Sequence, residues 1–144
     1  MKRHEALIPL SRQHHQLLLA GQLLKKDAPP YKGLPTEPKG KAAYLQQVFE
    51  GLWKLHTQAE EVVLVPFLKG VDQEVDRLLE ELVDEHQQIQ ELYDSIDFEN
   101  PAVNTMHALG ELMVLHIRKE ERQLFQRVQE VFGEKLRELD LGID

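Results

Sequence analysis

A motif that occurs twice constrains this chain more than any other feature. LHTQAEE places His56 four residues before Glu60, and LHIRKEE places His116 four residues before Glu120. Side chains at i and i+4 share one face of a helix, so each copy predicts an imidazole and a carboxylate that point the same way. The leucines and valines around each copy predict that this face is buried, where an isolated carboxylate is unfavourable. Two such pairs therefore indicate a shared cationic partner inside the protein.

A second, shorter repeat supplies two further histidines. The pattern L-x3-H-x2-[LI] surrounds His14 and returns 72 residues later around His86. His15 is an alternative to His14, but His14 shares a helical stripe with the flanking leucines and matches the repeat. The two kinds of box alternate along the chain, as in a bundle with a pseudo-two-fold axis.

Helical periodicity runs through four segments, and no segment alternates as a strand does. The predicted helices span about residues 9–26, 41–68, 72–95 and 101–132. Asn100 is expected to cap the fourth helix, with Pro101 at its first position. Leu55 and Val62 are expected on or beside the inner face of the second helix. The stretch EKLRELDL is expected to add a short C-terminal helix.

These elements predict an all-α protein, an antiparallel up-down-up-down four-helix bundle. One domain over residues 1–144 is expected, with the bundle core at about residues 8–132. DAPPYKGLPTEPKG is rich in proline and glycine and is expected to form an exposed loop over about residues 27–40.

The charge and composition of the chain bear on its partners. The net charge of −8 argues against nucleic acid or an anionic membrane as a partner. No apolar run approaches the ~20 residues of a membrane span. The N-terminal MKRHEALIPL lacks the apolar stretch of a signal peptide, so a cytoplasmic protein is expected. Cysteine is absent, which excludes disulfides, iron–sulfur clusters and cysteine-ligated zinc.

Together the two repeats predict one metal centre inside the bundle. Its candidate ligands are four histidines and two glutamates: His14, His56, His86, His116, Glu60 and Glu120. Mixed imidazole and carboxylate ligands suit iron, manganese or zinc better than magnesium or calcium. Bridging carboxylates can hold two metal ions about 4 Å apart. Glu61 and Glu121 should point about 100° away from the candidate ligands, toward solvent or a neighbouring helix.

The order H…HxxxE…H…HxxxE resembles that of the hemerythrin-like family, also called HHE cation-binding domains. LSRQHHQLLL, EHQQI and the two HxxxE boxes carry the resemblance, which covers roughly residues 8–130. It implies two non-haem iron ions, bridged by oxo or hydroxo, within the bundle, with zinc or manganese as substitutes. His56 and His116 would bind different irons, and Glu60 and Glu120 would bridge them. The iron to which each remaining histidine binds is left open.

Two positions depart from the oxygen-carrying hemerythrins. The carriers have a second histidine one turn from that of the third helix, where this chain has Leu82 before His86 and Gln90 after it. They also have an aspartate five residues after the last histidine, where this chain has Glu121. The four-histidine, two-glutamate set is similar to the sensing, iron-handling and nitrosative-stress branches of the family, and it implies a more open coordination position.

The leading hypothesis is a di-iron protein that binds or senses a small diatomic or redox species, with oxygen, nitric oxide and peroxide as candidates. An alternative is a di-iron redox enzyme that reduces nitric oxide or peroxide or repairs nitrosative damage. Iron storage or delivery and a structural zinc bundle are further alternatives. The sequence identifies no protein partner.

Overall fold

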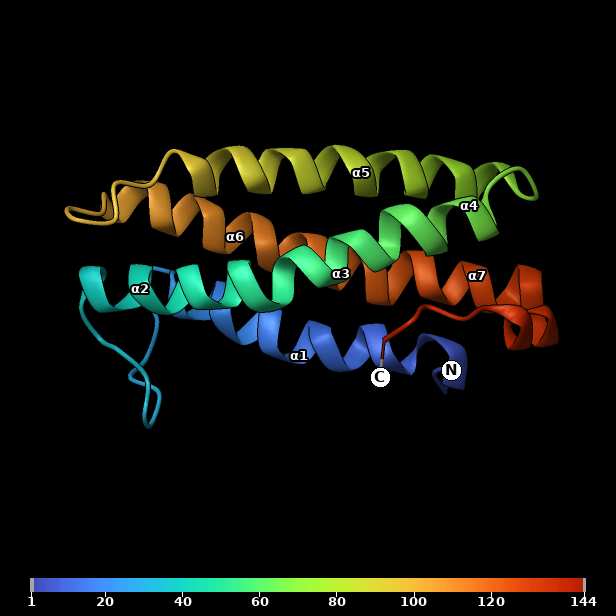
Figure 1. The fold of residues 1–144 in the computed structure, drawn as a ribbon, viewed down its shortest axis with the longest axis horizontal. Helices are drawn as coiled ribbons and strands as arrows, with labels where there is room; N and C mark the ends of the chain where they lie inside the picture. The colour runs from blue at the N-terminus through green and yellow to red at the C-terminus, as the bar shows by residue number, and fades with distance from the viewer. Residues whose placement is uncertain (1, 144) are drawn as a thin grey trace.

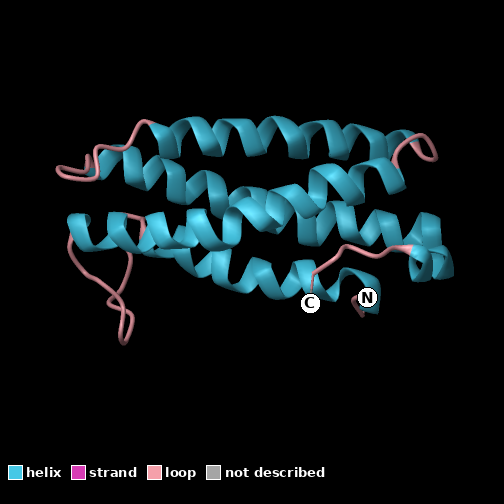
Figure 2. Cartoon of the chain, in the orientation of Figure 1, coloured by secondary structure: helices cyan, strands magenta, loops and turns pink. Residues whose placement is uncertain are grey.

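The computed structural model describes residues 2–143, and over these residues the chain consists of helices and connecting loops without a strand (Figure 2). In chain order the elements are η1 (Glu5–Leu7), α1 (Ile8–Leu23), α2 (Pro38–Val48), η2 (Phe49–Trp53), α3 (Lys54–Gln58), η3 (Ala59–Leu64), α4 (Val65–Leu68), α5 (Gln73–Asp94), α6 (Val103–Lys119), η4 (Glu120–Leu124), α7 (Phe125–Phe132) and η5 (Gly133–Glu138). The elements η2, η3 and η4 are π-helical turns, and η1 and η5 are 3-10 helices.

Because the π turns continue the helices on either side, the elements form four long rods (Figure 1). The rods are α1, then α2 to α4, then α5, then α6 to α7. They run antiparallel in sequence order, which confirms the predicted all-α bundle. The short C-terminal helix is also present, as the 3-10 helix η5.

Local signals fix where the third rod begins. Gly70 has a φ of 90°, which suits a residue without a side chain, and it makes the tight turn between α4 and α5. Asp72 then caps α5, because its carboxylate accepts a hydrogen bond from the Val75 N–H at 3.1 Å. Arg127 of α7 donates to the same carboxylate at 2.9 Å and ties this end of α5 to the fourth rod.

Two predicted boundaries were wrong. The second rod begins at Pro38, three residues before its predicted start, because a proline fits the first turn of a helix. The fourth rod begins at Val103 instead of Pro101, and Asn100 does not cap it. The N–H of Asn100 donates to Asp97 in a local turn, and this turn competes with the helix for the segment.

The prediction that Leu55 and Val62 lie near the inner face of the second rod was also wrong, since their exposed fractions are 55% and 66%. The helical wheel behind that prediction assumed 3.6 residues per turn throughout. The π turns η2 and η3 change this register on both sides of α3.

The apolar core consists of two clusters. The first includes Leu7, Leu10, Leu64, Leu68, Val75, Phe125, Val128 and Leu136, and the second includes Leu17, Leu45, Phe49, Trp53, Ile89, Leu109 and Met113. Along α1, His14 lies between a leucine of the first cluster and a leucine of the second, and along α5 His86 likewise lies between a residue of each cluster. The fold therefore reserves a polar layer in the middle of the bundle, with apolar layers above and below it.

Among the described residues, no helix is both long and apolar enough to cross a membrane.

Candidate metal centre

All six residues singled out from the sequence lie in the polar middle layer. His14 comes from α1, His56 from α3, His86 from α5 and His116 from α6, while Glu60 and Glu120 come from η3 and η4. Each of the six is buried, with an exposed fraction of 3% or less. His15, the alternative to His14, is exposed and does not join them.

The donor atoms fall into two groups that share Glu60. One group contains His14, His56, Glu60 and Glu120, and the other contains Glu60, His86 and His116. We name them the His14–His56 position and the His86–His116 position. Within each group the donor atoms lie within 4.8 Å of one another. The histidines of the first two rods thus fall in one group and those of the last two rods in the other, a division that the sequence left open.

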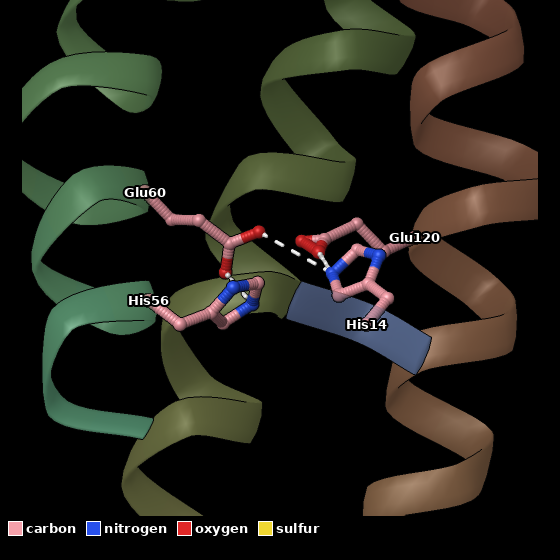
Figure 3. A group of neighbouring side chains, drawn as sticks. All are labelled: His14, His56, Glu60 and Glu120. Atoms are coloured by element: carbon pink, nitrogen blue, oxygen red, sulfur yellow. Dashed lines mark ion pairs between the residues drawn. The ribbon is translucent and has the colours of Figure 1, made fainter. Parts of the chain in front are cut away.

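Glu60 links the two positions through a single carboxylate. Its Oε1 lies 3.0 Å from His56 Nε2 and 2.9 Å from His86 Nε2. Its Oε2 lies 3.8 Å from His14 Nε2. Glu120 approaches from the opposite rod, with Oε2 2.8 Å from His14 Nε2, so the two carboxylates face each other across the centre (Figure 3).

The π turns coincide with these two glutamates. The Glu60 carbonyl accepts a hydrogen bond from the Val65 N–H, and the Glu120 carbonyl accepts one from the Phe125 N–H. Each bond spans five residues instead of four, which widens the helix at the point where its carboxylate enters the core. Single π turns inside α-helices occur frequently at functional sites.

Every histidine of the centre is oriented by a second hydrogen bond on its outer edge. The acceptors, which we call the outer acceptors, are Glu121 for His14 at 2.5 Å, Gln13 for His56 at 2.8 Å, Glu61 for His86 at 2.7 Å and Glu85 for His116 at 2.7 Å. In all four cases the histidine uses Nδ1. A proton on Nδ1 leaves Nε2 to face the centre as the potential metal ligand.

The outer acceptors follow the same repeat as the histidines. His14 and His86 are repeat counterparts, and so are their acceptors Glu121 and Glu61. His56 and His116 are counterparts in the same way, as are their acceptors Gln13 and Glu85. Sequence reasoning identified none of the four as an acceptor. It placed Glu61 and Glu121 toward solvent or a neighbouring helix, and each in fact reaches a histidine of another rod. The sequence signal that could have identified Glu61 and Glu121 as acceptors is the second glutamate that follows both HxxxE boxes.

The two buried glutamates have opposite protonation tendencies. Burial raises the pKa of Glu120, and the charge of Glu60 raises it further, well above the usual range. Burial also acts to raise the pKa of Glu60, but the charge of His56 and hydrogen bonds within the centre hold it well below the usual range. In the absence of a cation, the pair therefore carries one shared negative charge.

The histidines also divide into two kinds. Burial lowers the pKa of His56 and of His116. For His86, burial is outweighed by hydrogen bonds to Glu60 and Glu61, which raise the pKa to about 9. For His14, burial is likewise outweighed by Glu120, and the pKa lies well above its ordinary value. Without metal, His14 and His86 therefore favour the protonated imidazole, whereas His56 and His116 favour the neutral one.

Six buried donor atoms of the centre lack a hydrogen-bond partner. They are Nε2 of His14, His56 and His116, Oε2 of Glu60, and both carboxylate oxygens of Glu120. The short separation of His14 Nε2 and Glu120 Oε2 is thus a contact without hydrogen-bond alignment. Buried polar atoms are rarely left unsatisfied. Nitrogen and carboxylate donors that converge in this way fit a metal ion of the iron, manganese or zinc type.

An aromatic wall closes one side of the centre. The Trp53 ring lies 5.4 Å from the His86 ring and 6.2 Å from the His56 ring, between centroids. Its Nε1–H donates to Gln90 at 3.2 Å. This bond holds Gln90, one turn after His86, away from the centre, so that the amide is not a candidate ligand.

One comparison with known proteins gives a match. The family model of the hemerythrin HHE cation binding domain matches residues 4–128, a range that includes all six donor residues. No curated protein and no solved structure matches the chain.

Proposed function

The chain belongs to the hemerythrin HHE cation-binding domain family, and from this membership we propose that it holds two iron ions and uses them to bind or sense a small diatomic or redox species. We propose His14, His56, His86, His116, Glu60 and Glu120 as the metal ligands. Oxygen, nitric oxide and peroxide are the candidate species.

One observation carries the proposal. Six buried donor atoms converge on the middle of the bundle without hydrogen-bond partners, while every histidine is braced from behind through Nδ1. Hydrogen bonding to the outer edge fixes the tautomer and orientation that a metal ligand requires. A purely structural polar layer would instead satisfy its donors and acceptors internally.

The apolar layers on both sides of the centre support a redox role. When bound, an iron pair supplies electrons and open coordination positions to a small ligand. The chain's contribution is to exclude bulk water, to orient the imidazoles and to fix where ligand can approach. The buried leucines and phenylalanines of the two clusters serve the first purpose.

A small cavity supports a ligand of diatomic size. It has a volume of about 10 Å³, and its lining is polar at His116, Glu120, Glu85 and Lys119 and apolar at Leu78, Leu82 and Leu124. This is about the space of one water molecule. Leu82 stands one turn before His86, where it lines this cavity and adds no ligand.

Metal content and the absorption spectrum of protein purified under air test the proposal. We expect about two irons per chain, shared between the two donor groups, and charge-transfer bands in the near ultraviolet. The double variant Glu60→Ala, Glu120→Ala should lose both irons. His15→Ala is the matched control, because His15 is exposed and should leave iron content unchanged.

Addition of nitric oxide, oxygen or peroxide to the reduced protein should then change the spectrum. A colourless protein that holds zinc and resists iron reconstitution would contradict the redox proposal. Iron retained by the double variant would show that the ligand assignment is wrong.

A further inference from the structure

The two metal positions are related by the internal repeat, yet their surroundings differ. We infer that the His14–His56 position binds its metal first and retains it, whereas the His86–His116 position exchanges its metal readily. This inference rests on the proposed function and adds to it a division of labour between a retained and an exchangeable ion.

The first difference is the number and charge of the ligands. The donor atoms of two imidazoles and two carboxylates meet at the His14–His56 position, whereas those of His86 and His116 lie with Glu60 alone. Glu120, which the family resemblance implied as a second bridge, therefore stands on one side only. Glu120 accounts for the difference, because its Oε2 lies 2.8 Å from His14 Nε2. A second carboxylate in direct contact strengthens the hold on a divalent or trivalent cation.

The second difference is how firmly the outer acceptors are held. Glu121, behind His14, also accepts hydrogen bonds from Ser11 Oγ at 2.8 Å and from Arg3 Nη2 at 3.1 Å. Its repeat counterpart Glu61, behind His86, has a side chain that is 41% exposed. Among the described residues, Glu61 accepts a side-chain hydrogen bond only from His86.

The repeat itself explains this contrast. The residues 72 positions after Arg3 and Ser11 are Val75 and Val83, which cannot hydrogen-bond a carboxylate. The Arg3 guanidinium also lies 5.1 Å from the Phe125 ring centroid. Phe125 in turn stacks on His14 at 5.7 Å. Glu121 and Phe125 therefore hold the His14 imidazole, and Arg3 holds both of them in turn. The residues at the positions equivalent to Arg3 and Ser11 give no such support behind His86.

One feature acts in the opposite direction. His116 is backed by the carboxylate of Glu85, which Lys119 Nζ contacts at 2.7 Å, whereas its counterpart His56 is backed by the neutral amide of Gln13. A carboxylate behind an imidazole raises its basicity and its affinity for metal. This effect is transmitted through the ring, so we rank it below the direct contact of Glu120.

Metal release from the loaded wild-type protein tests the inference without any variant. The protein is loaded with iron(II) without oxygen, or with zinc, and mixed with an excess of chelator, and metal left on the chain is measured over time. We expect two phases of equal size that differ in rate by about tenfold or more. Two ions released in a single phase would overturn the inference and leave the proposed function standing, whereas no bound metal at all would overturn both.

A repeat-matched pair of variants assigns the phases. His86→Ala should keep one slowly released ion per chain, and His14→Ala should lose the slow phase. Arg3→Gln should speed the slow phase several-fold, while Lys119→Gln should leave the slow phase unchanged. A slow phase that survives in His14→Ala and disappears in His86→Ala would reverse the assignment and overturn the inference. Helical content by circular dichroism restricts the comparison to variants that fold.

Discussion

Gly110 of α6 meets Gly21 of α1 so closely that a Cβ on Gly110 would lie 2.4 Å from the Gly21 carbonyl oxygen. The first and fourth rods therefore touch backbone to backbone. The two glycines are chain neighbours of Ala20 and Leu109, which belong to the second apolar cluster.

The first prediction concerns this crossing. Gly110→Ala should destabilise the protein by about 1–3 kcal/mol, because the carbonyl it meets belongs to the backbone and cannot rotate away. Gly51→Ala is the matched control, since a Cβ at Gly51 has nothing within 4 Å. It should stabilise the helix by about 0.5–1 kcal/mol. Urea denaturation measures both, and equal midpoints for the two variants would contradict the close approach.

The second prediction uses Trp53 as a reporter. It is the one tryptophan of the chain and lies 5.4 Å from the His86 ring between centroids. Iron at the centre should quench its fluorescence strongly, because a paramagnetic, light-absorbing ion would be held close to the indole. Zinc should change the emission much less. Fluorescence that does not respond to iron, in protein shown by analysis to contain it, would mean that the ion binds elsewhere.

The third prediction concerns pH in the metal-free protein. The folded state raises the pKa of His86 to about 9, from an unfolded value near 6.5. Between these two values the folded protein binds more protons than the unfolded chain, so stability falls as pH rises. The contribution is complete below about pH 6.5 and lost above about pH 9, with a slope of at most about 1.4 kcal/mol per pH unit for one group.

His14 and Glu120, whose pKa values are also raised, add to the same trend. Denaturation curves of the metal-free protein between pH 6 and 9.5 test the prediction. With metal bound, the Nε2 protons are displaced and the dependence on pH should flatten or reverse. Metal-free stability that rises over this interval would contradict the protonation scheme.

The fourth prediction concerns Gln13, the one neutral outer acceptor. Gln13→Glu would give His56 the carboxylate that His116 already has in Glu85. Release of the retained metal should slow by about tenfold. The metal-free variant should be less stable, because the centre gains a further partly buried negative charge. Gln16→Glu adds the same charge at an exposed position of α1 and should change neither quantity.

Much of the bundle was predictable because its signals are local or periodic. The two repeats selected His14 over the adjacent His15 and brought all six candidate donors to one layer. The failures had physical causes that a helical wheel does not include. Leu55 was misplaced because π turns shift the register, and Asn100 was misassigned as a cap because Asp97 offers its N–H a local partner.

The bracing of the centre could not be predicted in the same way. Glu121 reaches His14 across the bundle, and Glu61 reaches His86 likewise, so each contact depends on how two rods are rotated relative to each other. Arg3 lies far from Glu121 in sequence, and no periodicity connects them. Such contacts follow from the packing of the rods rather than from the pattern within one of them.

The crossing of these contacts has a consequence for how the molecule is assembled. Each hairpin of two rods carries three of the six donors: His14, His56 and Glu60 in one half, and His86, His116 and Glu120 in the other. The histidine on the first rod of each half, His14 or His86, has its outer acceptor in the opposite half. Hydrogen bonds of the polar layer therefore hold the two halves together. Two identical hairpins related by a rotation would already contain every donor and every acceptor that the centre needs.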